Sequence, residues 1–181
     1  MRIAKNGDVH VSVPIGLPKR EVEAFIQKHQ EWIVQATKKT LERQQRRADF
    51  YGRLPLATKA ERLEAVMRLK ALVEPMIERH ARVMNVCPEV VSYKRMVSRW
   101  GVCKVKERSI SFSLYLLLLP DWCVEHVVVH ELCHLLEPSH NARFHALMDH
   151  YFPQWREARK ETLRMVKTGW SPQCPAGCSL P

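Results

Sequence analysis

The fold is decided by one hydrophobic stretch, which reads Asp121-Trp-Cys-Val-Glu-His-Val-Val-Val-His130-Glu131-Leu-Cys-His134-Leu-Leu-Glu-Pro-Ser-His140. It contains the motif His-Glu-x-x-His. On a helix, residues four apart share one face, so His130 and His134 can direct their imidazoles at a single ion. Glu131, one position further, can hold a water bound to that ion. Two neutral nitrogen ligands, an open coordination position and a carboxylate are what a zinc hydrolase requires.

The residues around the motif predict a buried helix. Valines 127–129 and Leu132 make it apolar on most of its circumference, so other elements must cover it. Polar side chains buried there need partners, and a bound metal would supply one. We expect Asp121 to cap the start of the helix and Pro138 to end it. His126, one turn before the motif, is interpreted as structural. The alternative reading is an ordinary core helix with internally satisfied histidines.

A catalytic zinc ion takes three protein ligands and one water, so a third ligand is needed. His140 is the best candidate, because the chain must turn at Pro138 and can bring this side chain back towards the first two ligands. His145 and Glu161 are less favoured alternatives.

The rest of the chain predicts one α+β domain over residues 1–170. Alternating apolar residues around Asn6-Gly7 predict a β-hairpin, and helical patterns continue to residue 86. Residues 87–170 are the predicted metal-binding core. Residues 171–181 are expected to form a disordered tail that contains Cys174 and Cys178, whose role the sequence leaves open.

Within this core we expect strands at 90–96 and 109–115, the second of which runs on through 116–119 and stops at Pro120, with a turn at 98–103 between them. The second strand precedes the metal-binding helix. We therefore expect it to offer its edge to an extended peptide substrate.

Charge and hydropathy narrow the class of partners. The formal net charge of +10 at pH 7 favours weak polyanion binding, although simple solubility explains it equally well. The longest apolar run, 114–119, is far short of the roughly 20 residues that a membrane span needs. No signal peptide is recognisable, so we expect a cytoplasmic protein with reduced cysteines and no membrane partner. The oligomeric state is not indicated.

Several of these segments together resemble the YgjP-like metal-dependent hydrolases, metallopeptidases akin to SprT-like zinc proteases. The segments that match in order and spacing are Ser98-Arg-Trp-Gly-Val-Cys103, Ile110-Ser-Phe-Ser-Leu114, Val127-Val-Val-His-Glu-Leu-Cys-His-Leu135 and Ser139-His-Asn-Ala-Arg-Phe144. The hairpin Gly7-Asp-Val-His-Val11 and the helix that contains Phe25 and Trp32 also fit. The resemblance therefore covers nearly the whole chain.

The resemblance implies a zincin-like α+β fold, with a small, mostly antiparallel sheet packed on helices and the His-Glu-x-x-His helix at the active site. It implies one zinc ion bound by His130, His134 and His140, with Glu131 as the general base. The sequence departs from the family where Val102 replaces its usual serine and Ser113 its usual asparagine. Both departures concern substrate preference.

The leading prediction is a zinc-dependent hydrolase, a metallopeptidase in which Glu131 activates a metal-bound water. A second prediction keeps the metal and changes the substrate to a nucleoside triphosphate, cleaved by a metal-dependent pyrophosphatase. Arg99 and Ser113 are the candidate substrate-binding residues in either case. A third prediction is a nucleic-acid-binding module with a structural metal, whose basic segment 38–53 contacts phosphates.

Overall fold

The computed structural model describes residues 1–168, so the predictions for 171–181 lie outside the described residues. The chain divides into two compact units, Met1–Asp49 and the chain from Phe50 onward. This boundary falls earlier than the one expected between residues 86 and 87. Whether the units act as one domain stays a prediction.

The first unit consists of a short hairpin and two helices. Its elements are β1 (Arg2–Ile3), β2 (Val9–His10), α1 (Lys19–Lys28) and α2 (Gln30–Gly52), whose last turn belongs to the second unit. The hairpin is confirmed, with Arg2 opposite His10 and Ile3 opposite Val9. At its turn, the Asp8 backbone N–H donates to Asn6 Oδ1 at 3.2 Å. Gly7 takes a φ of 93°, which favours glycine.

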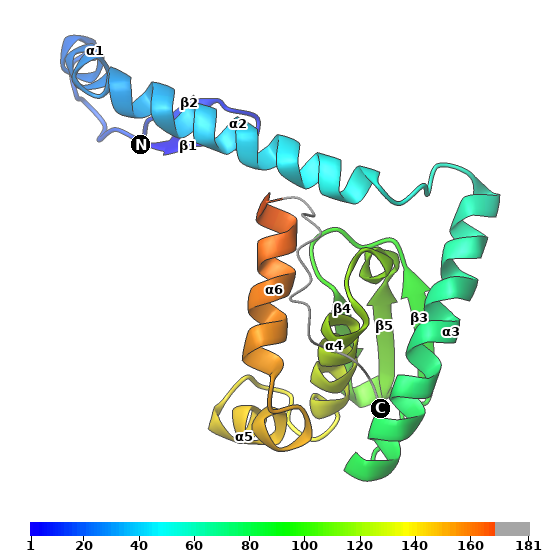
Figure 1. Cartoon of the computed structure of the whole chain (residues 1–181). Coiled ribbons are helices and arrows are strands. Elements are labelled where there is room, and N and C mark those ends of the chain that lie inside the picture. The colour runs from blue at the N-terminus through cyan, green and yellow to red at the C-terminus, as the bar shows by residue number, and fades with distance from the viewer. Residues whose placement is uncertain (169–181) are drawn as a thin grey trace. The chain divides into compact units, whose positions relative to one another are not determined.

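The second unit combines helices with a small sheet, and the α+β class is confirmed (Figure 1). Its elements are α3 (Lys59–Met84), β3 (Val90–Lys94), β4 (Gly101–Lys104), the 3-10 helix η1 (Val105–Glu107), β5 (Ser109–Ser113), the 3-10 helix η2 (Leu114–Leu118), α4 (Asp121–Cys133), α5 (Ala142–Tyr151) and α6 (Trp155–Thr168). None of the helices within residues 1–168 combines the length and apolarity of a membrane-spanning segment.

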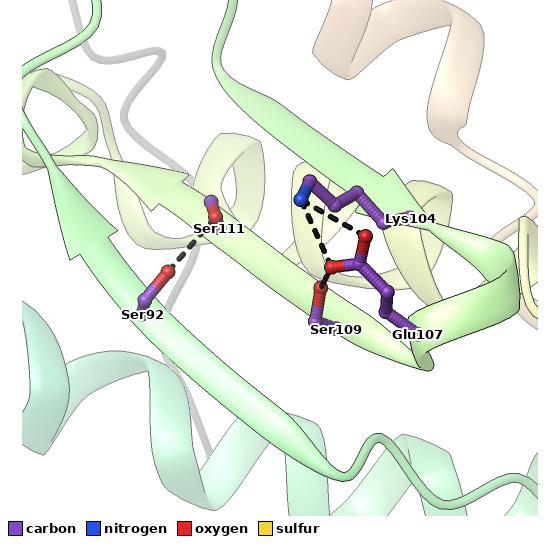
Figure 2. A network of polar contacts seen from close by, with 5 residues as sticks. All are labelled: Ser92, Lys104, Glu107, Ser109 and Ser111. Atoms are coloured by element: carbon purple, nitrogen blue, oxygen red, sulfur yellow. Dashed lines mark hydrogen bonds and ion pairs between the residues drawn. The ribbon is translucent and has the colours of Figure 1, made fainter.

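The sheet in this unit has the strand order β3-β5-β4, with β5 parallel to β3 and antiparallel to β4. Its inner face is apolar, because Ile110 and Phe112 are fully buried. Polar contacts on the other side are drawn in Figure 2. There the Ser92 and Ser111 hydroxyls lie 2.8 Å apart. The Lys104 ammonium donates to both carboxylate oxygens of Glu107, at 2.9 and 3.1 Å, and so braces the turn between β4 and β5.

The sheet corrects two expectations. The strand predicted at 109–115 ends at Ser113, where the hydroxyl accepts the Tyr115 backbone N–H and begins η2. It is also the central strand, so it cannot offer an edge. The segment predicted as a turn at 98–103 contains most of β4, which is one of the two edge strands. A continuous apolar run fits a buried strand and a buried helical turn equally well, so its pattern cannot tell the two apart.

Helix α4 is buried, as predicted, with nine of its 13 residues inaccessible. It contacts α3, α5, α6 and β4. The predicted cap is wrong: Pro120, extended with φ −61° and ψ 150°, occupies the N-cap position, and Asp121 is the first helical residue. An acidic group in the first turn still favours the helix dipole. The helix ends at Cys133, before Pro138, because the next backbone bonds tighten to a 3-10 pattern.

Candidate metal centre

The last turn of α4 and the loop after it bring three histidines to one point. His130 lies in the last turn of α4, His134 is the residue after its end, and His140 follows a tight loop. The ligand atoms of the three lie within 4.8 Å of one another. Nε2 of His140 is 3.0 Å from Nε2 of His130. Two nitrogens bound to one tetrahedral zinc at 2.0–2.1 Å lie about 3.3 Å apart, so this spacing fits a shared ion.

The loop between His134 and His140 is held by its own backbone and by Glu137. Glu137 Oε1 accepts the Ser139 backbone N–H at 3.2 Å. Asn141 then caps α5 by accepting the Phe144 backbone N–H at 3.0 Å. His134 Nδ1 lies 3.2 Å from the Glu137 carbonyl oxygen and donates to it. This bond assigns the proton to Nδ1 and leaves Nε2 free to bind a metal.

Phe144, the third residue of α5, packs against all three imidazoles. Its ring centroid lies 4.9 Å from that of His130 and 4.7 Å from those of both His134 and His140. The side chain is buried. It therefore limits the rotation of the three rings and keeps water away from one side of the cluster.

The donor set suits a divalent metal. Burial lowers the pKa of His130 to about 3, and the neighbouring imidazoles add to the effect. Burial likewise lowers the pKa of His134. These two rings are therefore neutral at physiological pH, with lone pairs available for a metal. Imidazole nitrogens bind zinc and related transition metals well, so the residues present fit such an ion.

Glu131 is buried next to the cluster and lies against β4. The Cβ of an alanine at position 101 would lie 2.5 Å from Glu131 Cγ and Oε1, so only glycine lets the carboxylate approach the strand this closely. Burial raises the pKa of Glu131 to about 8, while a hydrogen bond from the Cys103 backbone and the positive charge of Arg99 act against this rise.

The cluster opens into a cavity of about 570 Å³ within the second unit. Arg99 lines it, together with Gly101 and Glu131, and its role in substrate binding stays a prediction. Ser113, predicted to bind substrate, does not reach it. Ser113 is fully buried, and its hydroxyl donates to the Met96 carbonyl at 2.7 Å.

The two alternative ligands from the sequence lie outside the cluster. His145 lines the cavity and stacks on Trp155, with ring centroids 5.4 Å apart. Glu161 forms an ion pair with Arg164. The structure thus brings together His140 with His130 and His134, and leaves the alternatives apart.

Sequence reasoning gave no site role to Gly101, Phe144 or Arg159 and interpreted His126 as structural, whereas all four line the cavity. A glycine inside a strand is a general signal of close backbone approach, and it could have indicated the contact with Glu131. The other three carry no such signal, because only the packing of α4, α5 and α6 brings them together.

Comparisons with known proteins identify the family of the chain. No curated protein matches the chain. A similar solved structure is that of the metallopeptidase zymogen of Pyrococcus abyssi abylysin, which is 21% identical, covers 53% of this chain and 94% of its own, and superposes with a TM-score of 0.47. The model of the YgjP-like family, described as a metallopeptidase domain, matches residues 1–66 and 54–164. Because these matches span most of the sequence, the chain belongs to the YgjP-like metallopeptidase family.

Proposed function

We propose that this chain is a zinc-dependent peptidase in which His130, His134 and His140 hold the ion and Glu131 is the general base. The observation that carries the proposal is a buried carboxylate that directly follows one of the three clustered imidazoles. Three neutral imidazoles with a fourth position left open are typical of catalytic zinc sites. A zinc ion held there would supply a water of lowered pKa and polarise the scissile carbonyl.

In this proposal Glu131 accepts the proton of the attacking water and returns it to the leaving amine. A general base works best when its pKa lies near the working pH, and burial moves the pKa of Glu131 towards that range. Gly101 allows the carboxylate to lie against β4, and the Cys103 backbone hydrogen bond orients it.

The peptide would bind along β4. This strand ends the order β3-β5-β4, so among the described residues one of its sides has no strand partner. It also reaches the cavity at Gly101. An extended substrate can add to such an edge through main-chain hydrogen bonds, which places its carbonyls in register with the cluster.

The test compares zinc-loaded wild-type protein with Glu131→Gln on a panel of peptides and an unfolded protein. We expect wild type to cleave peptide bonds, and Glu131→Gln to keep its zinc while kcat/KM falls by about 10²–10⁴-fold. Glu125→Gln is the matched control. It makes the same change on α4 at a residue that binds Arg79 and His80 of α3 and does not line the cavity.

Three alternative outcomes would redirect the proposal. Undiminished cleavage by Glu131→Gln would remove its role as base. Nucleoside triphosphates belong in the same panel, because Arg99 lines the cavity and suits a phosphate. If they were hydrolysed and peptides were not, the substrate class would be wrong. Salt-sensitive nucleic-acid binding without turnover, unchanged in Glu131→Gln, would favour the binding module.

A further inference from the structure

The cavity into which the histidine cluster opens also contains a second group of polar side chains, which the proposed reaction does not use. His126 comes from α4, His145 from α5 and Arg159 from α6. All three line the same cavity as His130 and His140 of the candidate metal site. The ring centroids of His126 and His130 lie 6.0 Å apart, so this group is close to the reacting centre and separate from it.

His126 is a buried side chain without a partner. Only 7% of it is exposed. Within the described residues, neither of its ring nitrogens makes a hydrogen bond, and the same is true of Nδ1 of His145. Buried polar atoms in native proteins are nearly always hydrogen-bonded. The structural role expected for His126 from the sequence does not satisfy these atoms, and a group that enters the cavity can supply their partner.

The charge beside His126 shows what kind of partner is missing. Arg159 makes no hydrogen bond or ion pair within residues 1–168, and its positive charge reaches His126. Two carboxylates of α5 and α6 already form ion pairs, Asp149 with Arg156 and Glu161 with Arg164. Glu131 is the one acidic residue among the described residues that line the cavity. Arg159 is itself exposed, and an anionic group of a ligand in the cavity would complement its charge.

The geometry favours a carboxylate. The planar guanidinium of arginine matches the two oxygens of a carboxylate, and an imidazole N–H beside it can donate to the same group. Consecutive Cα atoms of a peptide are about 3.8 Å apart. His126, whose ring centroid lies 6.0 Å from that of His130, is therefore suitably placed to contact a carboxylate one or two residues from the scissile bond. The walls formed by Val127, Trp155 and Leu163 can enclose the rest of that residue.

We propose that Arg159 and His126 form a subsite that binds a carboxylate of the peptide substrate one or two residues from the bond that is cleaved. The inference rests on the proposed peptidase function and adds a preference to it. The carboxylate is supplied either by the free C-terminus of the peptide or by an aspartate or glutamate side chain.

The experiment uses three peptides of the same sequence with the full-length zinc-loaded protein. The first ends in a free carboxylate, the second in an amide, and the third is the amide with an aspartate placed within two residues of the cleaved bond. Arg159→Gln removes the charge at the subsite. Lys160→Gln is the matched control, because it is the next residue on the same helix, is exposed and does not line this cavity.

We expect Arg159→Gln to lower kcat/KM about 10- to 100-fold for the peptides that carry the relevant carboxylate, and to change cleavage of the plain amide less than about two-fold. Lys160→Gln should leave all three rates close to wild type. His126→Phe, which keeps a ring and removes both nitrogens, should lower the same rates as Arg159→Gln. If the first peptide alone responds, the source is the C-terminus; if the third responds, it is a side chain.

A binding experiment tests the carboxylate subsite independently of the proposed peptidase function. Isothermal titration of zinc-loaded Glu131→Gln with acetyl-alanine and with acetyl-alanine amide measures carboxylate recognition without turnover. A preference for the acid that Arg159→Gln abolishes supports the subsite even if no peptide is cleaved. Equal losses on all three peptides would overturn the subsite and leave the peptidase proposal intact. Equal binding of acid and amide, together with no response of the third peptide, would overturn it as well.

Discussion

The two units of this chain differ in how they are stabilised. In the first unit, Met1–Asp49, no side chain is buried, and large apolar residues such as Phe25, Trp32 and Leu41 are exposed. In the second unit, α4 alone buries nine of its 13 residues, and the sheet buries Ile110 and Phe112 completely. The first unit thus has helices and a hairpin without a core of their own, whereas the second has a continuous core.

This difference explains why the candidate metal site lies in the second unit. The first unit is held by local hydrogen bonds and by exposed helix pairs such as Lys19 with Glu23, and such pairs contribute little. The metal site needs side chains fixed to within a fraction of an ångström, which only close packing provides. Phe144 and the buried face of α4 provide it for the three histidines.

The largest effect we expect comes from truncating the core. Leu69→Ala in α3 removes a fully buried side chain and should lower the free energy of unfolding by about 2–5 kcal/mol. Leu41→Ala in α2 is the matched change in the first unit, where the side chain is 47% exposed, and should cost less than about 1 kcal/mol. Urea denaturation followed by far-UV circular dichroism measures both. Equal losses would show that Leu41 shares a core.

A smaller effect, confined to the site, is expected for Gly101→Ala. The added Cβ would lie 2.5 Å from Glu131, so the carboxylate must move away from β4. Displacing a catalytic group by about 1 Å can lower activity by about 10²-fold, and we expect a 10- to 100-fold loss in kcat/KM. Zinc content, measured by elemental analysis, should not change.

Gly52→Ala controls for the loss of a glycine, since an added Cβ there meets nothing within 4 Å. If Gly101→Ala retained full activity, the close approach of Glu131 to β4 would not be needed for turnover. If it lost zinc as well, the strand would be positioning the ligands rather than the base.

The sequence was most informative where chemistry and periodicity coincide. His130 and His134 share a face because helical spacing dictates it, and Asn141 caps α5 because of its residue type. The strand order could not be predicted from the sequence, because only long-range pairing shows that β4 lies at an edge and β5 at the centre of the sheet. For the same reason Ser113 appeared to border the cleft although it is buried.

The same limit applies to the cavity. The local sequence pattern shows that His126 lies on an apolar helix. It does not show that α6 brings Arg159 to the same cavity. It also cannot show that the first unit lacks buried side chains, because the apolar stripes of α1 and α2 look like those of any helix with a core to cover.

The smallest effect is expected from Gly7→Ala in the hairpin of the first unit. Gly7 has a φ of 93°, which costs an alanine roughly 1–2 kcal/mol, and the new Cβ would lie 3.3 Å from Leu41 Cδ2. Gly16→Ala is the matched control, with a φ of 91° and nothing within 4 Å. Hydrogen exchange should quicken at the hairpin amides, such as that of Ala4, which donates to the Asp8 carbonyl, and more in Gly7→Ala than in Gly16→Ala. Zinc content and the slow exchange of α4 should stay the same in both variants, because the core that positions the three histidines belongs to the other unit. Faster exchange in α4 on changing Gly7 would mean that the two units unfold together.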